Sequence, residues 1–162
     1  MFNTGDKVTY GAVGVCEIKD ITENELTGEL RKYYVLNPVD SDKSTIYVPV
    51  LNEKLTSRMR KIPSKPEFKS ILSKAKKDEL SWCNNNFERN DKFHAILNDG
   101  DIKENIKLLR ALNKRANELH KIGKHLPKAD ERIFKECSKL VCAEISLILS
   151  IDNSEVLPLV LN

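Results

Sequence analysis

The sequence predicts an α+β chain of two domains, a small β-sheet domain followed by an all-helical domain. In the first 50 or so residues, apolar and polar side chains alternate, which is the period of strands. From about residue 66 onward, apolar residues recur every three to four positions, which is the period of helices. A polar connecting segment at 52–66 separates the two patterns. We therefore expect one domain at 1–60 and a second at 66–162.

The first half contains four stretches with the composition of strands. Each is short, rich in β-branched or aromatic residues, and bounded by turn-forming residues. Gly11 and Gly14 lie between the first two of them, where a tight loop needs backbone with positive φ. Four or five such strands at close spacing predict a small curled sheet or barrel. The stretches are Lys7–Tyr10, Val15–Thr22, Arg31–Leu36 and Ser44–Val50.

The stretch at 44–50 raises the question of a partner. Pro49 has no N–H to donate, so the strand that contains it is expected at a sheet edge. An edge strand can pair with a strand of another protein through main-chain hydrogen bonds. The alternative is that the proline only protects the edge from such pairing. Both interpretations stay open at this point.

The second half predicts a series of helices. A stop and restart at Asn98–Asp101 separates two of them, with Asp99 or Asp101 as the N-cap of the helix that follows. The apolar tail at Val156–Leu161 is expected to dock or to pair. The expected helical segments are 66–76, 78–98, 102–119 and 129–151.

Composition excludes several classes of protein. Hydrophobic residues make up 40% and charged residues 31% of the 162 positions, which is typical of a soluble globular protein. There is no apolar run near the 18 or so residues of a membrane helix, and no secretory signal at the N-terminus. We therefore expect a cytoplasmic protein that has no membrane contact.

The residue types that carry chemistry show no catalytic or metal-binding pattern. The four cysteines form no CxxC pair, and the three histidines complete no metal spacing, so we expect reduced thiols and no metal. No P-loop, nucleophile elbow or glycine-rich dinucleotide motif is present. The expectation is a protein that is not an enzyme and has no cofactor.

Cations gather on the expected helix at 102–119. Lys103, Lys107, Arg110, Lys114 and Lys121 recur at intervals that place them on one side, about opposite the apolar face. Aligned cations repel one another, and neutralisation by phosphates would explain such a stripe. A second basic stretch, 58–77, holds eight Lys or Arg and one acid. Nucleic acid is the favoured partner, and a merely solvated helix face is the alternative.

Trp82, the single tryptophan, has two interpretations. It can be a core residue that anchors helices. It can also be an exposed apolar wedge that intrudes at a base step of DNA. The polar neighbours Asn84, Asn85, Asn86 and Arg89 could then reach base edges or phosphates.

An ordered set of residues gives the chain a family resemblance. The set comprises Phe2, Gly5-Asp6-Lys7-Val8, Tyr10, Gly14-Val15, Tyr33-Tyr34-Val35-Leu36, Val48-Pro49, Trp82 and Leu97-Asn98-Asp99-Gly100-Asp101 with the basic helix after it. With these residues the sequence resembles the CarD/CdnL transcription regulators, whose N-terminal domain is shared with transcription-repair coupling factors. Two positions depart from the family pattern. Relatives place the tryptophan nearer the Gly-Asp turn, where this chain has Asn86, and some have arginine at the place of Tyr47.

The resemblance implies a function. It implies a Tudor-like N-terminal domain that binds the RNA polymerase β subunit and a compact helical domain that contacts promoter double-stranded DNA and modulates the open complex. We expect a monomer whose polymerase contacts are Thr45, Ile46, Tyr47, Val48 and Pro49. The expected DNA contacts are Trp82, Asn85, Asn86, Arg89, Lys103, Lys107, Arg110 and Lys114. The alternatives are a polymerase-independent nucleic-acid-binding module and a protein-interaction adaptor.

Overall fold

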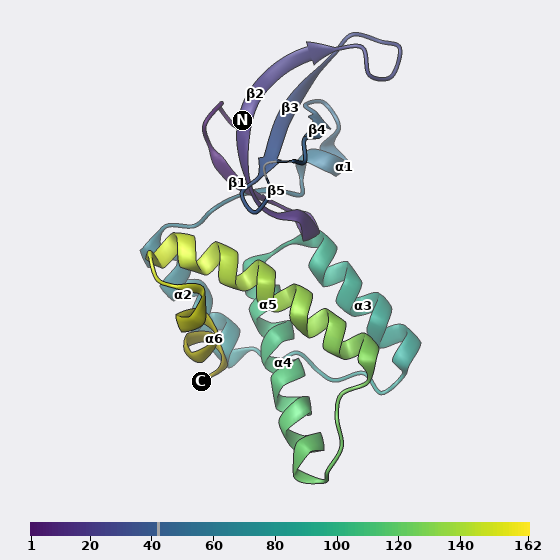
Figure 1. Cartoon of the computed structure of the whole chain (residues 1–162), viewed down its shortest axis with the longest axis vertical. Coiled ribbons are helices and arrows are strands. Elements are labelled where there is room, and N and C mark those ends of the chain that lie inside the picture. Colours follow the sequence, from purple (N-terminus) through teal and green to yellow (C-terminus); the bar gives the residue numbers. More distant parts are fainter. Residues whose placement is uncertain (42) are drawn as a thin grey trace. The chain divides into compact units, whose positions relative to one another are not determined.

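The fold is α+β, as predicted: a five-stranded antiparallel sheet is followed by a helical region (Figure 1). The structure is a computed structural model, and it describes residues 1–41 and 43–162. These residues form two compact units, Met1–Ile62 and Pro63–Asn162. The division lies inside the connecting segment at 52–66.

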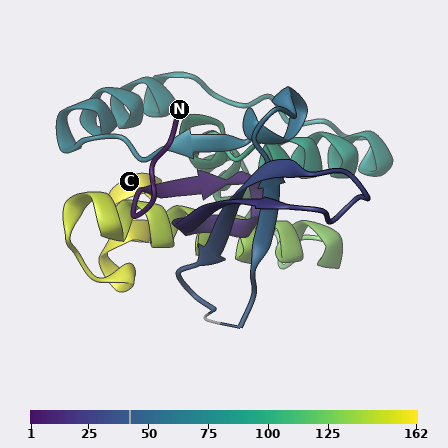
Figure 2. The same cartoon turned by 90° about the horizontal axis from the view of Figure 1, so that it is seen from above.

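The N-terminal unit is built on one sheet with the strand order β4-β3-β2-β1-β5. The long β2 and β3 pair as a curved hairpin, which the dark blue ribbons of Figure 2 show, with a bulge between Ile18 and Asp20. A short 3-10 turn joins β1 to β2, and Gly11 and Gly14 adopt positive φ there. The strands are β1 (Lys7–Tyr10), β2 (Gly14–Asn24), β3 (Arg31–Pro38), β4 (Ile46–Pro49) and β5 (Met59–Lys61).

One face of this sheet carries the hydrophobic core of the unit. Its residues occupy every second position of β2 and β3, as the sequence period predicts, and Thr9, Val15 and Tyr33 on neighbouring positions are also buried. The short helix α1 (Glu53–Thr56) follows β4 and packs Leu55 against this core. The core residues are Val8, Cys16, Ile18, Tyr34, Leu36, Val48 and Met59.

The strand β5 and the helix α1 lie in the segment that sequence analysis treated as a linker. Two basic residues, Arg60 and Lys61, make up most of β5, so no apolar alternation marks it. Its pairing with β1 is what makes it a strand, with Thr9 opposite Arg60. Such pairing depends on residues about 50 positions away, which local pattern does not record.

The C-terminal unit contains five helices, and α4 contacts all the others. Because of this central position, α4 buries Leu108 and Asn105 in addition to the predicted apolar face. Ser64 and Glu67 form a capping box at the start of α2. The helices are α2 (Lys65–Lys77), α3 (Asn86–Asp99), α4 (Ile102–Lys121), α5 (Lys128–Leu149) and α6 (Asn153–Leu161).

One helical expectation changes. The segment 78–85 is not helical, because the Asn85 side chain accepts hydrogen bonds from the N–H groups of Phe87 and Glu88 and starts α3 there. Trp82 therefore lies on an irregular segment before α3. The apolar tail forms α6, with Val156 and Val160 buried. Asp101 is the N-cap of α4, one of the two residues expected there.

Candidate functional site

The edge strand β4 is the first candidate site. Among the described residues β4 pairs only with β3, so the predicted edge position is confirmed. Val48 is fully buried in the core and Ile46 packs against it, whereas Tyr47 is 42% exposed on the other face. Of the expected contact residues Thr45–Pro49, Ile46 and Val48 therefore belong to the core side of the strand, and Tyr47 faces away from the core.

The direction of the main-chain groups of β4 follows from its register. Val50 N–H donates to the Lys32 carbonyl over 2.9 Å. Hydrogen-bonded pairs alternate in an antiparallel ladder. The main-chain N–H and C=O groups of residues 46 and 48 therefore also point toward β3. The N–H and C=O groups of Tyr47 therefore point away from the sheet. Pro49 has no N–H, and its carbonyl already accepts from Asn52 N–H at 3.1 Å.

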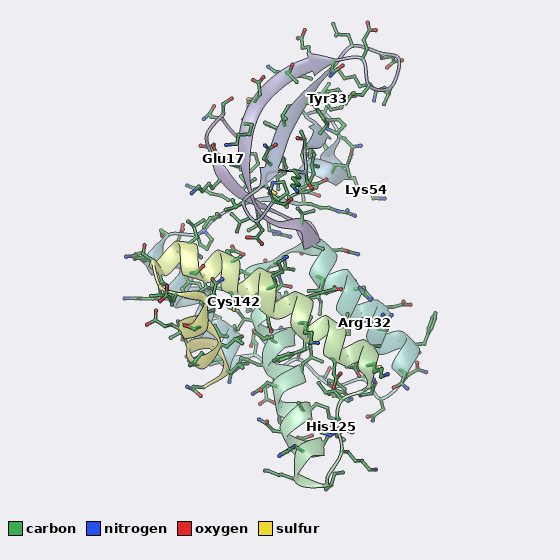
Figure 3. The ribbon with its side chains drawn as sticks, viewed as in Figure 1. Glu17, Tyr33, Lys54, His125, Arg132 and Cys142 are labelled. Carbon is green, nitrogen blue, oxygen red and sulfur yellow. The ribbon has the colours of Figure 1, made fainter. Side chains whose placement is uncertain are left out.

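Aromatic and aliphatic side chains lie next to this edge. The rings of Tyr33 and Tyr47 meet edge to face with centroids 6.3 Å apart. Tyr33 is buried to 2% exposure, and its hydroxyl has no hydrogen-bond partner. A groove of about 750 Å³ adjoins Pro49 and is lined by Leu30, Arg31, Lys32, Pro49, Leu51, Asn52 and Glu53. Figure 3 marks Tyr33 on β3 and Lys54 on α1, in the same unit.

The second candidate site surrounds Trp82 in the C-terminal unit. Its ring packs edge to face on Phe93 at 5.7 Å, and the guanidinium of Arg89 lies 4.8 Å from the ring centroid. Arg115 approaches at 5.9 Å. Trp82 is half-buried, so the structure gives it a packing role and leaves part of its ring accessible.

Arg89 lies at the centre of this arrangement. It donates to both carboxylate oxygens of Asp130 at 3.1 and 2.7 Å, and both side chains are about 5% exposed. It also donates to the Cys83 carbonyl and to Asn86 Oδ1. Arg89 therefore fixes the segment that carries Trp82 against α5. The buried guanidinium and its bonds inside the protein weigh against a DNA contact by Arg89, which stays a prediction.

The predicted cation stripe on α4 is not an open basic surface. Lys103 pairs with Asp78 at 2.8 Å, Lys107 with Glu104 at 3.2 Å, and Lys114 with Glu79 at 3.5 Å. The Lys103 ammonium, hydrogen-bonded to Asp78, holds the pKa of that carboxyl below its usual range.

Arg110 donates to the carbonyls of Val160 and Asn162 at the end of α6. The sequence pattern predicted a cation stripe with no acids beside it. In the structure, Asp78 and Glu79 of the segment after α2 lie beside α4 and pair with Lys103 and Lys114.

A groove of about 860 Å³ remains along this side of α4. The segment after α2 forms one wall and α4 the other, and Lys114 is 63% exposed at its side chain. Beside Trp82 the lining holds apolar and polar residues and charged residues of both signs. Whether Lys103, Lys107, Arg110 and Lys114 contact DNA stays a prediction, as it does for Asn85 and Asn86.

Sequence reasoning missed four residues that shape these sites. Asp130 pairs with Arg89 across 41 positions, and no local pattern links them. Asp78 and Glu79 neutralise cations more than 20 positions away. Phe87 is 77% exposed at the start of α3, next to the position where relatives have tryptophan.

The thiols of Cys16 and Cys137 are buried and stay protonated at neutral pH. Burial raises the pKa of Cys16 to about 11 and that of Cys137 to about 12. Cys137 Sγ also donates to the Asn105 carbonyl at 3.2 Å. In the described part of the chain, no group of three His, Cys, Asp or Glu side chains could hold a metal ion. The helices of these residues include none that is long and apolar enough to span a membrane.

Comparison with known proteins agrees with the N-terminal geometry. Residues 2–63 match the family model described as the CarD-like/TRCF RID domain. The match covers the N-terminal unit with its sheet and both edges. A search of curated proteins finds no match. The resemblance drawn from the sequence is confirmed for residues 2–63, which match the model of an RNA-polymerase-interacting domain.

Proposed function

We propose that this chain is a non-enzymatic transcription regulator that docks on the RNA polymerase β subunit and contacts promoter DNA with its helical unit. The match of residues 2–63 to the polymerase-interacting domain carries this proposal. The edge strand β4 supports it, since Tyr47 offers a main-chain donor and acceptor on the outer side of the sheet. We assign polymerase docking to β4 and the residues beside it.

The DNA contact is assigned to the groove between the 78–82 segment and α4. Lys114 and Lys121 line it, and both are exposed. Their neighbours Asp78 and Glu79 reduce the net charge, so contact with DNA depends on the polymerase to bring the duplex close. Affinity for free DNA is therefore expected to be weak and to fall steeply with salt.

The proposed effect is a change in the lifetime of the open promoter complex. A factor that binds one state of the complex more tightly shifts the balance by that difference in affinity. The experiment is to measure open-complex lifetime on a promoter with and without the full chain. A changed lifetime supports the proposal, and an unchanged lifetime with saturated polymerase contradicts it.

A second candidate is a protein-interaction adaptor with no DNA contact. The internal pairing of the α4 cations and the burial of Arg89 favour it. Replacing Lys114 and Lys121 by Glu separates the two. A promoter-contacting protein loses its effect on the open complex and keeps polymerase binding, whereas an adaptor keeps both.

A third possibility, a polymerase-independent nucleic-acid-binding module, predicts tight and salt-sensitive binding to naked duplex. A titration of the full chain with free duplex DNA at low and at high salt tests it.

A further inference from the structure

We propose that the partner strand pairs with β4 at Tyr47 only, and that the next part of the same strand places an aliphatic side chain in the groove between Leu30 and Leu51. The occupant is a segment of the RNA polymerase β subunit. This inference rests on the proposed function, because it takes docking through β4 as given. It adds the register of the pairing and a side-chain subsite.

The register follows from the hydrogen bonds of β4. Residues 46 and 48 direct their N–H and C=O groups toward β3. The hydrogen bond from Val50 N–H to the Lys32 carbonyl sets this register. Tyr47 is the residue of β4 whose two main-chain groups both face outward. At Pro49 the N–H is missing and the carbonyl accepts from Asn52. The ladder with a partner therefore stops after Tyr47.

A contact this short needs further surface to be specific. Two main-chain hydrogen bonds contribute about 1 to 3 kcal/mol together, far less than a stable complex requires. The groove that begins at Pro49 supplies this surface, and it is continuous with the free edge. Leu30 is 63% and Leu51 93% exposed at its rim. Exposed aliphatic side chains that lie together beside a binding edge indicate a protein-interaction surface.

The chemistry of the groove indicates what it takes. Leu30, Leu51 and Pro49 form an apolar part that fits a branched aliphatic side chain. Arg31 and Lys32 line the same groove. The Arg31 guanidinium forms a salt bridge with the Glu29 carboxylate at 2.7 Å. The segment that enters is thus apolar at its centre and accepts hydrogen bonds or carries an acid at its flank.

The test uses the full chain and purified RNA polymerase in a binding titration. We compare Leu51→Lys with Leu26→Lys, a matched control that is also exposed in the N-terminal unit, lies between β2 and β3, and is not among the groove residues. Leu51→Lys is expected to weaken binding at least tenfold and Leu26→Lys less than twofold. Because Leu51 is almost fully exposed, both variants should keep the wild-type melting temperature.

The outcomes separate the two proposals. If the wild-type chain does not bind polymerase, the proposed function fails. If the wild type binds and Leu51→Lys binds equally well, docking stands and the groove assignment is overturned. If Leu51→Lys instead abolishes self-association of the chain and spares polymerase binding, a second copy is the occupant and the inference is wrong. A photocrosslinker placed at residue 51 should label the β subunit, and labelling of another subunit alone also overturns it.

Discussion

Arg89 holds Asp130 through two hydrogen bonds while its guanidinium lies under the ring of Trp82. A single buried cation thus joins α3, α5 and the irregular segment before α3. Each partner depends on the others, since a buried charge that loses its counter-ion is costly. This relationship determines where Trp82 lies and how much of its ring is accessible.

The first prediction concerns this ion pair. Asp130→Asn is expected to lower the free energy of unfolding by about 3–5 kcal/mol, because it leaves the Arg89 charge buried without compensation. Urea unfolding measures the loss. Glu118→Gln, which breaks the exposed pair with Arg115, is the control and should change stability by less than about 1 kcal/mol. Equal effects of the two variants would contradict the assignment.

Trp82 reports on the same contact because it is the single tryptophan. In Asp130→Asn its fluorescence should shift to longer wavelength, since the segment that carries it is no longer fixed by Arg89. Glu17→Gln, which breaks a surface pair with Lys19 in the N-terminal unit, should leave the spectrum unchanged. A spectrum that is the same in all three proteins would show that Arg89 does not position Trp82.

A second prediction concerns the hydroxyl of Tyr33. This hydroxyl is buried without a hydrogen-bond partner, so removing it relieves a desolvation cost. Tyr33→Phe is expected to leave the free energy of unfolding unchanged or to raise it by up to about 1 kcal/mol. Tyr34→Phe is the comparison, because the Tyr34 hydroxyl accepts from the N–H of Phe2. A loss of stability in Tyr33→Phe alone would contradict the burial of an unpartnered group.

A third prediction concerns pH. The folded pKa values of Cys16 and Cys137, about 11 and about 12, lie above the ordinary value of 9.0. The protonated thiols therefore contribute stability that is complete below pH 9 and is lost as the pH rises through about 11 for Cys16 and about 12 for Cys137. Thermal unfolding from pH 8 to 11 should show a steeper loss in the wild type than in a Cys16→Ala, Cys137→Ala double variant. Parallel profiles would contradict the prediction.

A fourth prediction concerns the acids beside the α4 cations. Asp78→Asn with Glu79→Gln removes two negative charges that pair with Lys103 and Lys114. Binding to duplex DNA should tighten severalfold at low salt, and its salt dependence should become steeper. Glu23→Gln with Glu25→Gln, an exposed acidic pair in the N-terminal unit, is the matched control. Unchanged DNA binding in the first variant would place the DNA contact elsewhere.

Much of the fold could be predicted from local pattern. The two periods gave the order of sheet and helices, and Pro49 indicated the edge position of β4. The features that could not be predicted all depend on residues distant in sequence. The β5 strand exists through its pairing with β1, and the state of Arg89 is decided by Asp130. The stripe on α4 looks uniform until Asp78 and Glu79 are placed beside it, so charge pattern on one helix overestimates its attraction for DNA.

The most direct test of the central claim is a binding titration of the full chain with purified RNA polymerase, using variants of Tyr47. Tyr47→Pro removes the outward N–H of β4, and Tyr47→Phe keeps that group and the ring. We predict saturable binding by the wild type and by Tyr47→Phe, and a loss of at least tenfold in Tyr47→Pro with circular dichroism unchanged. Equal binding by Tyr47→Pro, or no binding by the wild type, would contradict docking through this edge.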